Sequence, residues 1–68
     1  MSELVVIDYT NWRGKRADRH IRPKSLFFGT SSFHEADGDQ WYLVADDLEK
    51  GTERWFAMKD IHSWRPRP

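Results

Sequence analysis

The stretch Trp41-Tyr42-Leu43-Val44-Ala45 is the clearest β-strand in the sequence, and it decides the fold class. Side chains alternate between the two faces of a strand, so Trp41, Leu43 and Ala45 share one face. Tyr42 and Val44 point to the opposite face. Aromatic and β-branched side chains of this kind are common in strands. The stretch therefore predicts a sheet, and its partners are to be sought in the segments on either side.

Segments with similar alternation flank this strand. We expect strands at residues 3–9, around Arg19–Arg22 with a continuation at 25–28, at 54–58, and as a last short strand at Trp64. Pro23 has no backbone donor, so its strand lies at a sheet edge or bends there. Turn-forming residues separate the segments at Asn11–Gly14, at 35–40 with Asp37-Gly38, and at 48–52 with Gly51, and a short turn is expected near Ile61.

Short strands separated by turns at regular spacing are typical of a small barrel or sandwich. Closing the sheet protects its edges, which favours a barrel in so short a chain. We therefore predict an all-β fold, a small SH3-like or Sm-like barrel of about four to five antiparallel strands. Residues 1–62 are expected to form the barrel, and residues 63–68 a short C-terminal strand end and frayed tail.

The composition excludes several classes of protein. The 68 residues suffice for one domain, and the absence of cysteine excludes disulfides and thiolate metal sites. Neither a signal-peptide pattern nor an apolar run of about 20 residues is found, so a soluble, cytoplasmic protein is expected.

The net charge is zero, but the charges are unevenly distributed. Residues 13–24 contain six basic residues and one acidic residue, a net charge of +5, whereas residues 35–53 contain seven acidic residues and one basic residue, a net charge of −6. One interpretation is an anionic partner bound at the basic segment. The other is that the two segments are neighbouring strands whose outward charges pair with each other.

Three motifs follow one another along the chain. Residues 19–26 fit the pattern Arg-x-(Val/Ile)-x-Pro-x-x-Leu, Trp41-Tyr42-Leu43 is followed by Ala45 and Asp46, and residues 54–61 fit Arg-x-Phe-x-(Leu/Met)-x-x-Ile. With residues 7–11 and Gly14 upstream, the series resembles the WYL domain family from about Val5 to Ile61.

The resemblance implies an Sm- or SH3-like barrel of bacterial origin that senses an anionic ligand, such as a single-stranded nucleic acid or a nucleotide. Such domains usually follow a winged-helix DNA-binding domain in transcription factors. The 68 residues contain no helix-turn-helix segment, so direct transcriptional regulation by this chain is not expected. Asp60 also departs from the family, which often has a basic residue at that position.

The resemblance further implies that Arg19, Tyr42 and Arg54 line the ligand site. Arginine can grip a phosphate with two parallel hydrogen bonds, and tyrosine adds a hydroxyl and a stacking face. The alternatives are that Arg54 pairs with Asp46 or Asp47 across a hairpin, and that Tyr42 is a packing residue.

Other candidates lie nearby in the sequence. Arg22 and Lys24 belong to the basic segment, and His34 follows the 29–32 loop, so each is a candidate ligand contact. Trp12 and Arg13 form a turn with the composition of an interface hot spot, although Trp12 could equally cover one end of the barrel. Trp41 and Trp55 are expected in the core.

Catalysis and metal binding find little support. The chain has no nucleophile motif and no phosphate-binding glycine loop, and the adjacent Asp46 and Asp47 point to opposite faces. His20, His34 and His62 do not have the spacing of metal ligands. We therefore expect no enzyme activity, no metal and no cofactor.

Two functions remain. The first is a non-catalytic sensing module for an anionic ligand: single-stranded nucleic acid, an oligonucleotide or a nucleotide. The alternative is a protein–protein interaction or homo-oligomerisation module that docks on a partner protein or a second copy through exposed aromatic residues and a sheet edge.

Overall fold

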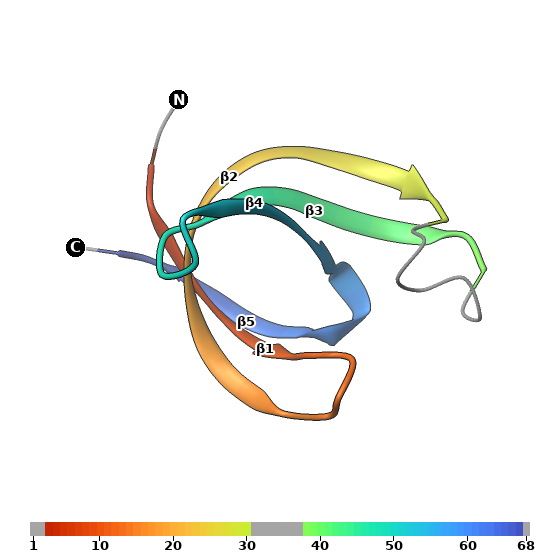
Figure 1. Cartoon of the computed structure of the whole chain (residues 1–68), viewed down its shortest axis with the longest axis horizontal. Helices are drawn as coiled ribbons and strands as arrows, with labels where there is room; N and C mark the ends of the chain where they lie inside the picture. The colour runs from red at the N-terminus through yellow and green to blue at the C-terminus, as the bar shows by residue number, and fades with distance from the viewer. Residues whose placement is uncertain (1–2, 31–37, 68) are drawn as a thin grey trace.

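The computed structural model describes residues 3–30 and 38–67, which form five antiparallel strands of one sheet (Figure 1). The elements are β1 (Val5–Thr10), β2 (Arg16–Gly29), β3 (Gln40–Asp47), β4 (Thr52–Ala57), the 3-10 turn η2 (Met58–Asp60) and β5 (Ile61–Pro66). The predicted all-β class is confirmed. The predicted hairpin turn at 35–40 lies largely outside the described residues.

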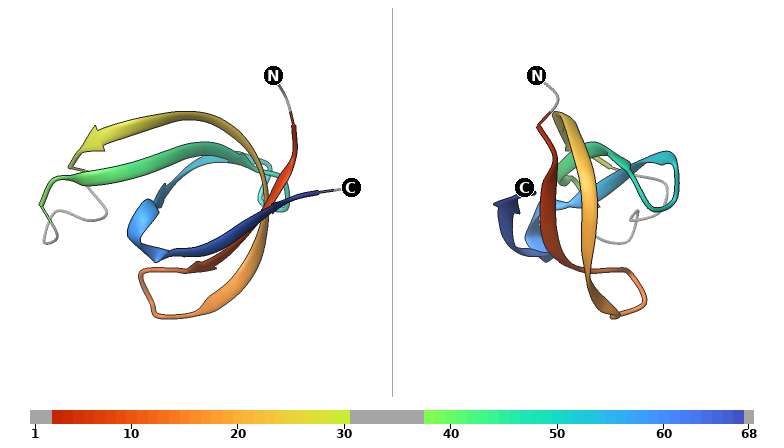
Figure 2. Two further views of the ribbon diagram at one scale, coloured as in Figure 1. Left: turned by 180° about the vertical axis from the view of Figure 1, so that it is seen from behind. Right: turned by 90° about the vertical axis from the view of Figure 1, so that its left-hand side faces the viewer.

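The strand order is β4-β3-β2-β1-β5. β2 is long enough to pair with β1 through its first half and with β3 through its second half, and its register shifts between Pro23 and Ser25. A bulge at a residue without a backbone donor bends the strand, as predicted for Pro23. The bend folds β3 and β4 over β1 and β5, as the two views in Figure 2 show.

The barrel is partly open. β4 and β5 are the two ends of the strand order, and the ladders of the described residues do not join them. The closed sheet expected from the sequence is therefore not formed, although the curled shape of a small barrel is kept. β5 runs through Pro66, and the backbone N–H of Arg67 donates to the carbonyl of Leu4 at 2.9 Å.

One face of the curled sheet forms the core. Its buried residues come from four strands and are Ile7, Tyr9, Ile21, Leu43, Ala45 and Phe56. The rings of Tyr9 and Phe56 pack edge to face, with centroids 4.9 Å apart. The alternation read at 41–45 thus assigns Leu43 and Ala45 to the correct face.

The turn between β1 and β2 forms as predicted. The side-chain oxygen of Asn11 accepts hydrogen bonds from the backbone N–H groups of Arg13 and Lys15, both at 2.9 Å. Gly14 has a φ of 81°, a conformation that glycine adopts without strain. This local bonding fixes the direction in which Trp12 and Arg13 leave the sheet.

The predicted burial of two tryptophans is wrong. Trp41 is 53% exposed and Trp55 is 39% exposed. Both have the alternation of strand residues, but Trp41 lies beyond the pairing of β3 with β4, and Trp55 lies on β4, which is at one end of the strand order.

Candidate functional site

Arg19 and Arg54 lie on the core side of the sheet. Arg19 is opposite Ile7 in the ladder between β1 and β2, and Arg54 is opposite Ala45 in the ladder between β3 and β4. Ile7 and Ala45 are both core residues, and residues opposite each other in a ladder share a face. The structure therefore places on one face of the sheet two of the three residues that the resemblance implied.

The side chain of Tyr9 belongs to the same face of the sheet as these arginines. Its hydroxyl accepts a hydrogen bond from the backbone N–H of Ala57 at 3.4 Å. Burial raises the pKa of Tyr9 above its ordinary value of 10.0, and the positive charges of Arg54 and Arg19 act in the opposite direction. Both guanidinium groups thus act electrostatically on one phenol, and Tyr9 is a candidate site residue that the sequence patterns did not indicate. The alternation of Val5, Ile7 and Tyr9 indicates that the Tyr9 side chain points to the core, but no motif of the sequence indicated a functional role for it.

Arg19 is held by a buried carboxylate. Its Nη1 lies 3.8 Å from Oδ2 of Asp47, and the side chains are 18% and 0% exposed, respectively. Asp47 Oδ1 accepts hydrogen bonds from the backbone N–H groups of Glu49 and Lys50, at 3.0 and 3.2 Å. Neither Asp47 Oδ2 nor Arg19 Nε has a hydrogen-bond partner. Arg19 is therefore oriented by Asp47, but its hydrogen-bonding capacity is not exhausted.

Arg54 is partly buried and has no ion-pair partner among residues 3–30 and 38–67. The two aspartates considered as its partners are engaged elsewhere: Asp46 with Lys24, at 3.7 Å, and Asp47 with Arg19. The predicted cross-hairpin pairing of Arg54 is therefore not found in the described structure. Its charge remains available on the core side of the sheet.

Tyr42 does not join the two arginines. It points to the opposite face of β3, is fully buried, and its ring lies 5.7 Å from that of Trp55. Its hydroxyl accepts a hydrogen bond from Nε2 of Gln40 at 3.1 Å. No face of the ring is exposed for stacking, so the geometry agrees with the packing alternative, and a ligand contact by Tyr42 remains an untested prediction.

The outer face of the sheet carries paired charges. Lys24 Nζ lies 2.6 Å from Glu53 Oε2, and this hydrogen bond is the main cause of a pKa of Lys24 above its ordinary 10.5. Arg22 is exposed and lies opposite Asp46 in the ladder. Lys24 thus forms the cross-strand charge pairs of the second interpretation. Arg22 and Lys24 lie apart from the face that carries Arg19 and Arg54. His34 lies outside the described residues.

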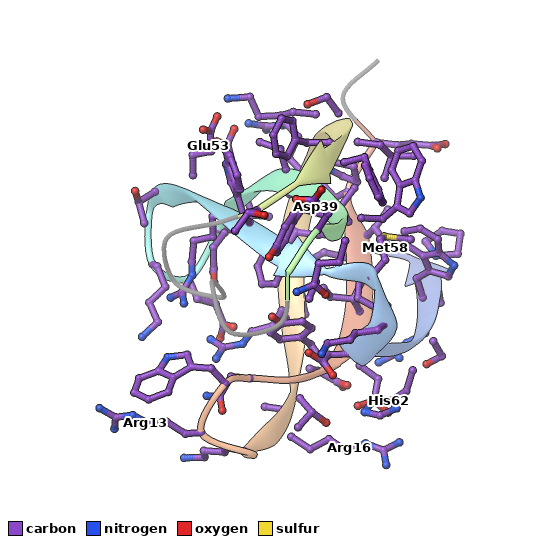
Figure 3. The ribbon with its side chains drawn as sticks, turned by 90° about the vertical axis from the view of Figure 1, so that its right-hand side faces the viewer. Arg13, Arg16, Asp39, Glu53, Met58 and His62 are labelled. Atoms are coloured by element: carbon purple, nitrogen blue, oxygen red, sulfur yellow. The ribbon has the colours of Figure 1, made fainter. Side chains whose placement is uncertain are left out.

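The turn between β1 and β2 presents an aromatic ring and a cation to solvent. Trp12 is 68% exposed, and the guanidinium carbon of Arg13 lies 4.9 Å from the centroid of the Trp12 ring. Trp12 therefore does not act as a lid. Arg16, at the start of β2, donates two hydrogen bonds to Asp8, at 2.9 and 2.7 Å, which lowers the pKa of Asp8. Figure 3 shows Arg13 and Arg16 at the end of the molecule opposite to Glu53.

Two further findings concern the part of the chain that the structure describes. No group of three or more histidine, aspartate or glutamate side chains in residues 3–30 and 38–67 is placed to hold a metal ion. Within the same ranges, no helix has the length and apolar character required to cross a bilayer.

Comparison with known proteins agrees with the motif series. The model of the WYL domain family matches residues 2–66, nearly the whole chain. No curated protein and no solved structure matches. The family resemblance predicted from residues 19–26, 41–46 and 54–61 is thereby confirmed.

Proposed function

Given that this chain belongs to the WYL domain family, a family of ligand-sensing and regulatory domains, we propose that it is a non-catalytic module that binds an anionic ligand. The ligand class is single-stranded nucleic acid, an oligonucleotide or a nucleotide. The proposal includes a cytoplasmic location, which the absence of cysteine favours.

The observation that carries the proposal is the difference between the two inward arginines. Arg19 is oriented by Asp47, whereas Arg54 has no carboxylate within ion-pair distance in the described structure. A guanidinium without a carboxylate partner can bind a phosphate with two charge-assisted hydrogen bonds. Arg19 lies on the same face and adds a second positive charge, while its Nε is buried and has no hydrogen-bond partner within the described part of the chain. An anion bound at Arg54 would pair with the guanidinium that lacks a carboxylate among the described residues.

Trp12 and Arg13 extend the proposal to ligands longer than one nucleotide. An exposed indole offers a stacking surface, and stacking of a base on an aromatic ring is worth about 1–3 kcal/mol. The guanidinium over the ring brings a positive charge to the same place. A nucleotide held at Arg54 alone would not depend on Trp12, whereas a longer strand that also reached the turn would.

The test is a titration of the intrinsic tryptophan fluorescence with short single-stranded oligonucleotides at two salt concentrations. Hydrogen bonds to charged groups contribute about 1.5–3 kcal/mol, so Arg54→Ala should weaken binding by about 10- to 100-fold. Affinity of the unmodified protein should fall as salt is added, because phosphate binding releases counterions.

Arg67→Ala is the matched control. Arg67 is exposed, and the substitution removes the same charge from the end of β5, away from the core face. Its affinity should stay within about threefold of the unmodified protein, as expected for an isolated surface charge. Equal affinities of Arg54→Ala and the unmodified protein, or no binding at low salt, would contradict the proposal.

A further inference from the structure

The distal parts of β2 and β3 form a ribbon of only two strands. β1 pairs with β2 no further than Ile21, and β4 pairs with β3 no further than Tyr42. Beyond these points Phe28 is opposite Trp41 and Gly29 is opposite Gln40, and no third strand of residues 3–30 and 38–67 pairs beside them. Figure 1 shows the ends of β2 and β3 extending past the other strands. No strand among the described residues therefore covers the side of the ribbon that continues the core face.

That side carries large apolar residues. Leu26 is 57% exposed, Phe28 54% and Trp41 53%, and the rings of Phe28 and Trp41 lie 5.2 Å apart. Leu26 is opposite the core residue Leu43, so the three side chains prolong the core in the direction of solvent. We call Leu26, Phe28 and Trp41 the ribbon face.

The same face of the sheet continues on β5. Trp64, which is 52% exposed, lies opposite the core residue Ile7. Aromatic side chains cover roughly 150–250 Å² each, so the two half-exposed rings and the leucine of the ribbon face present about 300 Å² of apolar surface. The largest apolar patch of a typical monomer is about 300–600 Å² and often functional.

A hollow adjoins the ribbon face. Its volume is about 470 Å³, and its apolar wall is formed by Val5, Pro23, Leu26 and Leu43. Leu26 belongs both to the hollow and to the ribbon face. The protein thus has projecting aromatic rings and an apolar depression side by side on one surface.

We propose that the ribbon face and its hollow form the interface of a symmetric dimer with a second copy of this chain. Rings and hollow on a single surface are self-complementary: a two-fold axis brings the Phe28–Trp41 pair of each copy to the hollow of the other. A standard interface buries about 800 Å² per partner, and the ribbon face with the hollow lining supplies the apolar centre of such an area.

The charges of this surface favour a protein occupant over a nucleic acid. Lys24, the one basic residue among the residues lining the hollow, is engaged by Glu53 and Asp46. Glu3, which also lines the hollow, is acidic. A phosphate backbone would find no unengaged cation there, whereas an apolar surface of another chain needs none.

The experiment is a measurement of molar mass by sedimentation equilibrium over a range of concentrations. The unmodified protein should approach twice the chain mass, and Phe28→Glu and Trp41→Glu should stay at one chain mass. Both positions are half-exposed, so a glutamate is tolerated in the monomer, which circular dichroism checks. Trp12→Glu is the matched control: it changes a more exposed tryptophan outside the ribbon face, and it should dimerise normally.

Three results would overturn the proposal. The first is one chain mass for the unmodified protein at all concentrations. The second is continued dimerisation of both ribbon variants, and the third is a mass that rises beyond two chains, which would indicate joining through the free edges of β4 and β5. The ribbon variants keep Arg19 and Arg54, so their oligonucleotide affinity tests the proposed ligand site independently of dimerisation.

Discussion

Asp47 is the buried charged residue among residues 3–30 and 38–67, and its replacement gives the sharpest test of how the core side of the sheet is held together. The carboxylate has two tasks. Oδ1 accepts the backbone N–H groups of Glu49 and Lys50 in the turn between β3 and β4, and Oδ2 faces Arg19 at 3.8 Å. Asp47→Ala removes both.

The expected cost follows from these contacts. Glu49 and Lys50 are exposed, so water partly replaces the lost acceptor, and each hydrogen bond contributes about 1 kcal/mol. Breaking a fully buried ion pair costs about 3–5 kcal/mol, but Arg19 is 18% exposed and the pair is long, so about 1–2 kcal/mol is expected here. The total is about 3–4 kcal/mol, a large part of the roughly 3–10 kcal/mol typical of a chain of this length.

Asp47→Asn is the control, because the amide keeps an oxygen acceptor for the turn and loses only the charge. It should cost about 1–2 kcal/mol. Both variants are measured by urea denaturation followed by far-ultraviolet circular dichroism, with unchanged m-values as the sign of an intact two-state transition. A loss below about 1 kcal/mol for Asp47→Ala would refute the assignment of Asp47 as a structural centre. Equal losses in the two variants would show that the charge, and not the turn, matters.

Two further predictions concern the core. Phe56→Ala should cost about 3–5 kcal/mol, because Phe56 is 1% exposed and packs on Tyr9, and thermal unfolding should then begin near room temperature; a melting temperature close to that of the unmodified protein would contradict this. Burial raises the pKa of Tyr9 above 10.0, so the neutral phenol contributes stability below pH 10 that is lost as the pH rises through the folded pKa. Tyr9→Phe should therefore lose less stability between neutral and strongly alkaline pH in urea titrations, and parallel pH profiles of the two proteins would count against a buried Tyr9 hydroxyl.

Much of the fold could be predicted from short-range features. The bend at Pro23 follows from its missing donor, and the turn at Asn11–Gly14 follows from residues that bond within the turn itself. The core positions of Leu43 in β3 and of Phe56 in β4 follow from the alternation along each strand. Each of these features depends on residues adjacent in the chain.

The candidate site was predicted only in part. The motif series named Arg19 and Arg54, and the structure places both on the core face. Tyr42 was grouped with them, although it belongs to the other face, and Tyr9 was overlooked. The pairing of Arg19 with Asp47 depends on the ladder between β2 and β3, in which Ile21 lies opposite Asp47, and such a register cannot be read from either segment alone.

The sequence by itself determined which residues form strands, where the chain turns and bends, and which side chains share a face, because these are properties of the local backbone. The tertiary structure decided which faces are covered. Trp41 and Leu43 share a face of β3, yet Trp41 is 53% exposed and Leu43 is 4% exposed, because the curled sheet lies over one and ends before the other. Burial is set by strands distant in sequence. The same distant strands decide the exposure of the ribbon face and the lack of an ion-pair partner for Arg54 among the described residues.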